Sequence, residues 1–207
     1  CRIILYGLES DISLGRALID MYAKCEGFLE AEHVFDKLDN KGIVSWNSLI
    51  ASYLPRGYAA IEVFESMQEQ GILADKITYL YVLKACGNSR AISKAEEIHA
   101  EIVIKGFEGD LAVSSTLVGM YVKCGLLVEA REVFDCLPNR NIVVWGAMVA
   151  GYAQHGLGEE ALNCFDRMQH EGFTPDAVTF SCVLKACSSI GAISKGEEIH
   201  DEILRKG

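Results

Sequence analysis

Residues 111–141 read LAVSSTLVGMYVKCGLLVEAREVFDCLPNRN, and this stretch predicts a pair of short helices. Leu117, Met120, Tyr121 and Cys124 are spaced i, i+3, i+4, i+7, which places them on one face of a helix. A glycine then interrupts the pattern. The same spacing recurs, ahead of a proline stop signal, at Ala130, Val133, Phe134 and Leu137. Two helices this short cannot bury both of their faces alone, so the sequence predicts neighbouring hairpins of the same kind.

A copy of this stretch lies 99 residues earlier, within residues 12–42. The two copies align without a gap, and the residues of the first copy that recur in the second are Leu18, Met21, Tyr22, Lys24, Cys25, Glu30, Ala31, Val34, Phe35, Asp36 and Leu38. The segments that follow also recur, although their offset changes from 99 to 101 residues near Gly57–Ala60. The chain is therefore built from internal repeats.

The repeats divide the chain into helical hairpins. The predicted boundaries are 1–11 (the end of an earlier hairpin), 12–42, 43–75, 76–110, 111–141, 142–176 and 177–207. Each complete hairpin has room for two helices of about 12–14 residues and short turns. In 43–75, which is two residues shorter than its partner, Pro55 predicts a shortened first helix or a tightened turn. We expect an all-α fold, a right-handed α-solenoid of stacked helix-turn-helix repeats, each contacting only its neighbours.

Composition restricts the class of protein. Nineteen basic and 29 acidic side chains give a net charge of −10, which by itself argues against nucleic-acid binding. A solenoid can nevertheless keep one basic face within an acidic whole. No apolar run is long enough for a membrane span, so none is expected. The chain begins with Cys1 inside a repeat and without a signal or transit segment, so we interpret it as a piece of a longer protein.

The eight cysteines are interpreted as reduced thiols that fill small spaces in the core. Cys25 and Cys124 occupy one repeat position, and Cys86 and Cys187 occupy another. The closest pair in sequence, Cys182 and Cys187, is not a CxxC motif, and no CxxC occurs anywhere. The sequence therefore predicts no metal site and no cofactor.

Three motifs alternate along the chain: YxKCG…EAxxVFD, W[NG]…F…M…G…D and VLKAC…EEIH…KG. This alternation resembles the plant pentatricopeptide repeats of the PLS class, in which standard (P), long (L) and short (S) repeats follow one another. The resemblance makes 12–42 and 111–141 S-type and makes 43–75 and 142–176 P-type. It makes 1–11, 76–110 and 177–207 L-type, the last of them truncated.

The resemblance implies sequence-selective binding of single-stranded RNA, with one base for each repeat. It further implies the address-reading part of an organelle RNA-processing factor for C-to-U editing, and hence a location in chloroplast or mitochondrion. In this family the fifth and last residues of a repeat select the base. The resemblance thereby associates the pair Asn47 and Asp75 with uracil in preference to cytosine. It associates the pair Ser115 and Asn141 with adenine.

The remaining base-selecting positions depart from the family pattern. They are Gly146 with Asp176, Arg16 with Gly42, and Leu80 with Asp110. Ser181, in the truncated last repeat, is also assigned to base recognition. An aliphatic side chain cannot hydrogen-bond a base edge, whereas Asn both donates and accepts and ionised Asp only accepts. We therefore expect strong discrimination at only two of the five complete repeats.

The resemblance also assigns residues that hold the RNA without selecting a base. The second residue of each repeat flanks the base faces: Val44, Ile77, Ala112, Val143 and Val178. Lys24 and Lys123, at the thirteenth position of the S-type repeats, resemble the family's phosphate-contacting lysine. The P-type repeats carry Pro55 and Gln154 there, so the contact to the backbone is expected to be uneven.

Each of these residues also has a simpler structural interpretation. The acidic and amide residues that end the repeats precede predicted helices, where they would serve as N-caps, a role compatible with base reading. Asn47 and Ser115 could be ordinary polar surface, and Lys24 and Lys123 could be solvated. Trp46 and Trp145 are predicted to lie in the core.

No catalytic constellation is found in the sequence. His99 and His200 recur beside paired glutamates without an HExxH motif, so they are interpreted as packing or surface residues. The HxE…PCxxC arrangement of the zinc deaminases is absent. We therefore predict that this segment is no enzyme and includes no E or DYW domain.

A second class of function stays open at this point. The resemblance also allows a protein-binding helical scaffold that docks accessory editing proteins through its L-type repeats, and the net charge of −10 favours that alternative.

The hairpins at the two ends of the array have no capping repeat to cover their apolar faces. We therefore expect end-to-end self-association of the array.

Overall fold

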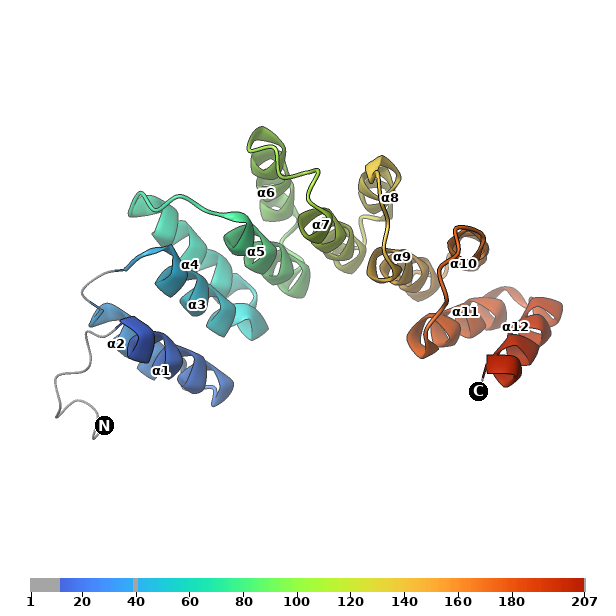
Figure 1. Cartoon of the computed structure of the whole chain (residues 1–207), viewed down its shortest axis with the longest axis horizontal. Helices are drawn as coiled ribbons and strands as arrows, with labels where there is room; N and C mark the ends of the chain where they lie inside the picture. Colours follow the sequence, from blue (N-terminus) through green and yellow to red (C-terminus); the bar gives the residue numbers. More distant parts are fainter. Residues whose placement is uncertain (1–11, 39–40, 207) are drawn as a thin grey trace. The chain divides into compact units, whose positions relative to one another are not determined.

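The computed structural model describes residues 12–38 and 41–206, and within these ranges every regular element is helical (Figure 1). The chain forms two compact units, Cys1–Phe107 and Glu108–Gly207. The predicted hairpin end at 1–11 lies outside the described residues.

The first unit contains three hairpins. Its helices are α1 (Ile12–Lys24), α2 (Phe28–Asp36), α3 (Ile43–Tyr53), the short 3₁₀ helix η2 (Leu54–Arg56), α4 (Tyr58–Glu69), α5 (Lys76–Ser89) and α6 (Ile92–Ile104). The second unit repeats this arrangement. Its helices are α7 (Leu111–Cys124), α8 (Leu127–Cys136), α9 (Ile142–Gln154), α10 (Gly158–His170), α11 (Ala177–Ile190) and α12 (Ile193–Lys206).

Each unit has two layers of helices. The odd-numbered helices, called the first helices below, pack on one another: α1 on α3 and α3 on α5 in the first unit, and α7 on α9 and α9 on α11 in the second. An even-numbered helix packs on the first helix of its own hairpin and, within a unit, on the first helix of the next hairpin. Each hairpin therefore buries its apolar faces against its neighbours in the same unit.

An aromatic contact recurs between the first and second hairpins of both units. Phe35 meets Trp46 edge to face with ring centroids 4.7 Å apart, and Phe134 meets Trp145 in the same way at 4.7 Å. Such contacts contribute about 0.5–1.5 kcal/mol beyond the buried area. Both tryptophans are buried, which confirms that they belong to the core.

Polar contacts join the even-numbered helices of the last two hairpins in each unit. Lys94 of α6 lies 2.9 Å from Glu65 of α4, and Lys195 of α12 lies 3.0 Å from Asp166 of α10. Because these pairs are partly exposed, each contributes little to stability alone. The same contact therefore recurs in both units.

The expected irregularity at Pro55 is confirmed. Helix α3 has 11 residues where its counterpart α9 has 13, and the chain continues through η2, which contains the proline. Gly57 follows with φ +33°, and a Cβ at this position would lie 2.6 Å from Cβ of Ser89. A residue with a side chain cannot occupy this turn without displacing α5.

The cysteine predictions were partly wrong. Cys86 and Cys187 are buried as expected, but Cys25 is exposed and Cys124 only half-buried. Helix α1 ends at Lys24, so Cys25 lies in the turn that follows and not on the buried face of the helix.

Within the described ranges, no group of three metal-ligating side chains gathers and no helix is long and apolar enough to span a membrane.

Two glycines of the second unit test the packing. A Cβ at Gly158, the first residue of α10, would lie 2.5 Å from Cγ2 of Ile190 and 3.1 Å from the Ala186 carbonyl oxygen. Gly158→Ala should therefore destabilise the protein by about 1–3 kcal/mol through overpacking. A Cβ at Gly119, within α7, meets nothing within 4 Å, so Gly119→Ala should stabilise by about 0.5–1 kcal/mol. Urea denaturation measures both, and equal shifts of the same sign would contradict this packing.

Candidate nucleic-acid interface

The residues that the sequence assigns to base reading lie at or near the N-terminal ends of the first helices. Each last residue of a complete predicted repeat is the N-cap of the next first helix: Gly42, Asp75, Asp110, Asn141 and Asp176. Apart from Gly42, each cap accepts a hydrogen bond at Oδ1 from the third backbone N–H of its helix, over 2.8–3.2 Å. The structural role as N-caps is thus confirmed.

Asn47 and Asp75 are brought together. Asn47 Nδ2 donates to Asp75 Oδ1 over 3.2 Å, while Thr78 Oγ1 lies 2.8 Å from Asn47 Oδ1 and 2.9 Å from Asp75 Oδ1. The Asp75 backbone N–H donates to Thr78 Oγ1 over 3.2 Å, which completes a capping box. Asn47 is buried, with 6 % of its surface exposed, and Thr78 is fully buried.

The electrostatics of this cluster favour an ionised aspartate. Burial alone would raise the pKa of Asp75, but the hydrogen bonds from Thr78 and Asn47 outweigh it and lower the pKa below its ordinary value. Asp75 therefore accepts hydrogen bonds and donates none near neutral pH.

The repeat 142–176 has the same cap but no amide at its fifth residue. Asp176 Oδ1 accepts from the Thr179 backbone N–H over 2.8 Å and from its hydroxyl over 2.7 Å. A Cβ on Gly146 would lie 3.6 Å from Thr179 Oγ1, an ordinary contact distance. A Cβ at this position would therefore point beside the same hydroxyl without a clash.

Ser115 and Asn141 are not joined by a hydrogen bond. The Ser115 hydroxyl oxygen is buried and has no hydrogen-bond partner among the described residues, while Asn141 Oδ1 accepts from Val144 N–H over 2.9 Å. The reason is chemical: serine is shorter than asparagine, and Val144, the third residue of α9, stands where α5 and α11 have Thr78 and Thr179. This leaves a polar atom in the first turn region of α7 without a partner.

The other predicted base-selecting residues lie on the first helices or at their N-caps. Arg16 is exposed on α1, Ser181 is exposed on α11, and Gly42 contributes no cap side chain. Leu80 is half-buried on α5 of the first unit, and Asp110 caps α7 of the second.

The predicted base-flanking residues all lie exposed in the first turn of a first helix. Val44 is 46 % exposed, and Ile77, Val143 and Val178 are 50–68 % exposed. Ala112 is exposed as well. These aliphatic side chains contribute little to the core, so they are accessible to a ligand.

The two predicted phosphate-binding lysines are exposed near the ends of α1 and α7. Lys24 Nζ lies 2.8 Å from Asp20 Oδ2, one helical turn earlier. Such an exposed i, i+4 pair is weak, so a phosphate could compete for the ammonium group.

Thr78 was missed as a site residue by the sequence reasoning. The capping signal was present, because Thr78 and Thr179 each follow an aspartate by three residues (DKIT at 75–78 and DAVT at 176–179), which is a capping spacing. The hydrogen bond between Thr78 and Asn47 could not be found from spacing, since it joins different helices.

Comparison with known proteins identifies the family. The model of the PPR repeat family matches residues 41–88 and 140–189, and the PPR repeat model matches 16–43, 113–142 and 178–207. The chain belongs to the pentatricopeptide-repeat family. The matches together cover most of the chain and include four of the five caps.

The relatives are plant proteins. Pentatricopeptide repeat-containing protein At4g30700 of Arabidopsis thaliana is 38 % identical over 95 % of this chain and 25 % of its own length. At3g02330, a mitochondrial protein of the same plant, is 39 % identical over 95 % of this chain and 24 % of its own length. Others are named chloroplastic. The chain thus spans about a quarter of the length of these two relatives.

A solved structure supports the fold class. The pentatricopeptide repeat protein PPR10, crystallised with an 18-nt psaJ RNA element, superposes with a TM-score of 0.73 at 22 % identity. The match covers 90 % of this chain and 29 % of that protein. The expected all-α solenoid of pentatricopeptide repeats is therefore confirmed.

The caps predict how stability depends on pH. Hydrogen bonds from the Thr179 backbone N–H and hydroxyl lower the pKa of Asp176 below its ordinary value. This stabilisation is complete above the pKa of the unfolded chain and is lost as pH falls through the lowered pKa of the folded protein. The urea midpoint of the wild type should therefore fall more steeply below pH ~5 than that of Asp176→Asn, whose amide caps without titrating. Parallel curves would contradict this.

Proposed function

We propose that this segment binds single-stranded RNA and selects one base for each complete repeat, as the address-reading part of an organelle RNA-processing factor. The observation that carries the proposal is the hydrogen-bonded pair of Asn47 and Asp75 at the start of two adjacent first helices. Exposed aliphatic residues stand beside it at Val44 and Ile77, where they can cover the two faces of a base. The RNA complex of PPR10, a protein of the same fold, supports this mode of binding.

The Asn47–Asp75 pair is suited to uracil. Uracil offers an N3–H donor between two carbonyl oxygens, and the ionised Asp75 can accept from the donor while Asn47 donates to a carbonyl. Cytosine has a lone pair at N3, which would face the carboxylate and be repelled. The N–H groups of Asn47 Nδ2 and of the Thr78 backbone both donate to Oδ1 of Asp75, and the Thr78 hydroxyl lies on the same side, so we expect Oδ2 to face the base.

The Ser115–Asn141 pair is suited to adenine. The Asn141 amide can donate to N1 of adenine and accept from its amino group, because an amide has both functions. The Ser115 hydroxyl has no hydrogen-bond partner among the described residues, but its oxygen is buried, so Asn141 carries this assignment. In the chain order, with the RNA 5′ end toward the N-terminus, the adenine-reading repeat comes two repeats after the uracil-reading one.

We propose a role in C-to-U editing on the basis of the PLS alternation, and the mitochondrial and chloroplastic names of the relatives support a location in an organelle. Lys24 and Lys123 would contact phosphates, and the remaining repeats would tolerate several bases. Deamination would be carried out by another domain or protein. The PLS assignment and repeat types belong to this proposal.

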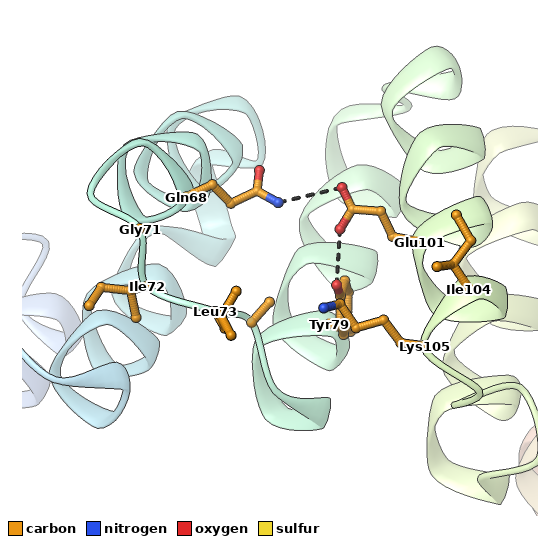
Figure 2. A pocket seen from close by; sticks show the side chains of 9 residues that line it. Gln68, Gly71, Ile72, Leu73, Tyr79, Glu101, Ile104 and Lys105 are labelled. Carbon is orange, nitrogen blue, oxygen red and sulfur yellow. Dashed lines mark hydrogen bonds between the residues drawn. The ribbon is translucent and has the colours of Figure 1, made fainter.

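A second candidate function is protein binding through the L-type repeat 76–110. A hollow of about 290 Å³ lies between α4, α5 and α6 (Figure 2). In it, Glu101 accepts hydrogen bonds from the Tyr79 hydroxyl over 2.9 Å and from Gln68 over 3.4 Å. Leu73 and Ile104, which also line it, are 76 % and 84 % exposed. Such a polar floor with apolar edges suits an accessory editing protein.

A salt titration separates the two candidates. RNA binding followed by fluorescence anisotropy should weaken with a log–log slope of about −0.7 for each phosphate contact. Binding of a protein partner in the mainly apolar hollow should barely respond to salt. No RNA binding even at low salt would overturn the first candidate.

Asn141→Asp tests the register of reading. Ionised aspartate can accept from N1–H and the amino group of guanine but cannot donate to adenine N1. The ratio of affinities for A over G opposite repeat 111–141 should therefore fall by about tenfold, which corresponds to one hydrogen bond. The preference opposite Asn47 is the internal control and should not change. An unchanged A-over-G ratio would contradict the assignment.

Gly146→Asn tests the same geometry by gain of function. The introduced amide has room beside Thr179 and Asp176, as Asn47 has beside Thr78 and Asp75. The variant should acquire a uracil preference of about tenfold opposite repeat 142–176. Anisotropy with RNAs that differ only at this base measures it, and Gly146→Ala is the control. Equal affinity for all four bases would contradict the proposal.

A further inference from the structure

We propose that Thr78 is a positioning residue for base selection by the preceding repeat, so that the specificity of one repeat is partly encoded in the next. Thr78 lies on α5, in the repeat after the one that contains Asn47. It is fully buried and cannot contact RNA itself. The inference rests on the proposed function, because it concerns how Asn47 presents its amide to a base.

The geometry holds the Asn47 amide at both ends. At the nitrogen end, Nδ2 donates to Asp75 Oδ1 over 3.2 Å. At the oxygen end, Oδ1 accepts from the Thr78 hydroxyl, 2.8 Å away. With Oδ1 turned toward the protein, the group left for a base is the second N–H of Nδ2. The amide is therefore fixed as a donor, which suits a carbonyl oxygen of uracil.

The hydroxyl of Thr78 is what fixes this orientation. Without it, Asn47 Oδ1 would be buried and unsatisfied, which is costly. The amide would then rotate toward solvent to find a partner, and its bond to Asp75 would weaken. Asn47 could then offer either a donor or an acceptor to a base, and discrimination would be lost while aliphatic contacts to the base remained.

The other repeats show that this position varies. The third residue after each repeat end is buried throughout: Ser45, Thr78, Val113, Val144 and Thr179. Only the two threonines combine a hydroxyl with an aspartate cap, and only Thr78 faces an amide. Thr179 therefore shares the capping role of Thr78 but has no amide to orient, which makes it a matched control.

The test compares Thr78→Val with Thr179→Val. Valine keeps the shape and removes the hydroxyl, so each variant loses the hydroxyl contact to its own aspartate. RNA binding is measured by anisotropy with all four bases opposite each P-type repeat. Thr78→Val should lower the uracil preference opposite repeat 43–75 by about five- to tenfold, the effect of one hydrogen bond. Thr179→Val should leave the base ratios at both repeats unchanged.

Two further variants separate positioning from stability. Thr78→Ser retains the hydroxyl and should restore the uracil preference even if its urea midpoint is lower than that of the wild type. If Thr78→Val does not fold, Gly146→Asn and the double variant Gly146→Asn/Thr179→Val provide the same comparison. The uracil preference acquired by the single variant should be lost in the double variant.

The outcomes distinguish the inference from the function beneath it. A Thr78→Val protein, or the double variant, with the same base ratios as its parent would overturn the positioning role while leaving RNA reading intact. A wild-type protein that binds RNA without any base preference opposite repeat 43–75, or binds none, would overturn the proposed function and the inference together. Loss of preference in Thr78→Val with recovery in Thr78→Ser supports both.

Discussion

The side-chain hydrogen bond that caps α5, α7, α9 and α11 is the constraint on which the candidate interface depends. One side-chain oxygen must stay beside the third N–H of the helix, so the last residue of a repeat has a fixed place and orientation. Where the fifth residue of the preceding first helix is long enough, as Asn47 is, the two polar groups meet. A local rule of helix formation thereby produces a recurring pair of hydrogen-bonding groups, and the same side chain serves stability and recognition.

Packing between hairpins makes this geometry repeat. Neither helix of a hairpin can bury its apolar face alone, so each relies on the neighbours with which it forms the two layers of its unit. The edge-to-face contacts of Phe35 with Trp46 and of Phe134 with Trp145 hold successive hairpins at similar spacing. The exposed aliphatic residues of the first turns contribute little to this packing, so they remain accessible to a ligand.

Much of this could be predicted from the sequence, because the signals are local or periodic. The internal copies give the hairpins, Pro55 gives the broken helix, and residues such as Asp75 before a helix give the caps. Contacts between helices could not be predicted in this way. Spacing did not connect Thr78 to Asn47, and it did not show that Ser115 lacks a hydrogen-bond partner. Cys25 was assigned to the core because the pattern extended past the point where α1 ends.

The most direct measurement is an in vitro selection of RNAs that bind the protein, from a pool with random sequence. Two strongly selecting repeats with one tolerant repeat between them predict a single enriched motif. Read from 5′ to 3′, it should be uracil, any base, then adenine, for the pairs Asn47 with Asp75 and Ser115 with Asn141. Enrichment of that spacing would support one base per repeat in this register. No enrichment, or a uracil and an adenine at another spacing, would contradict it.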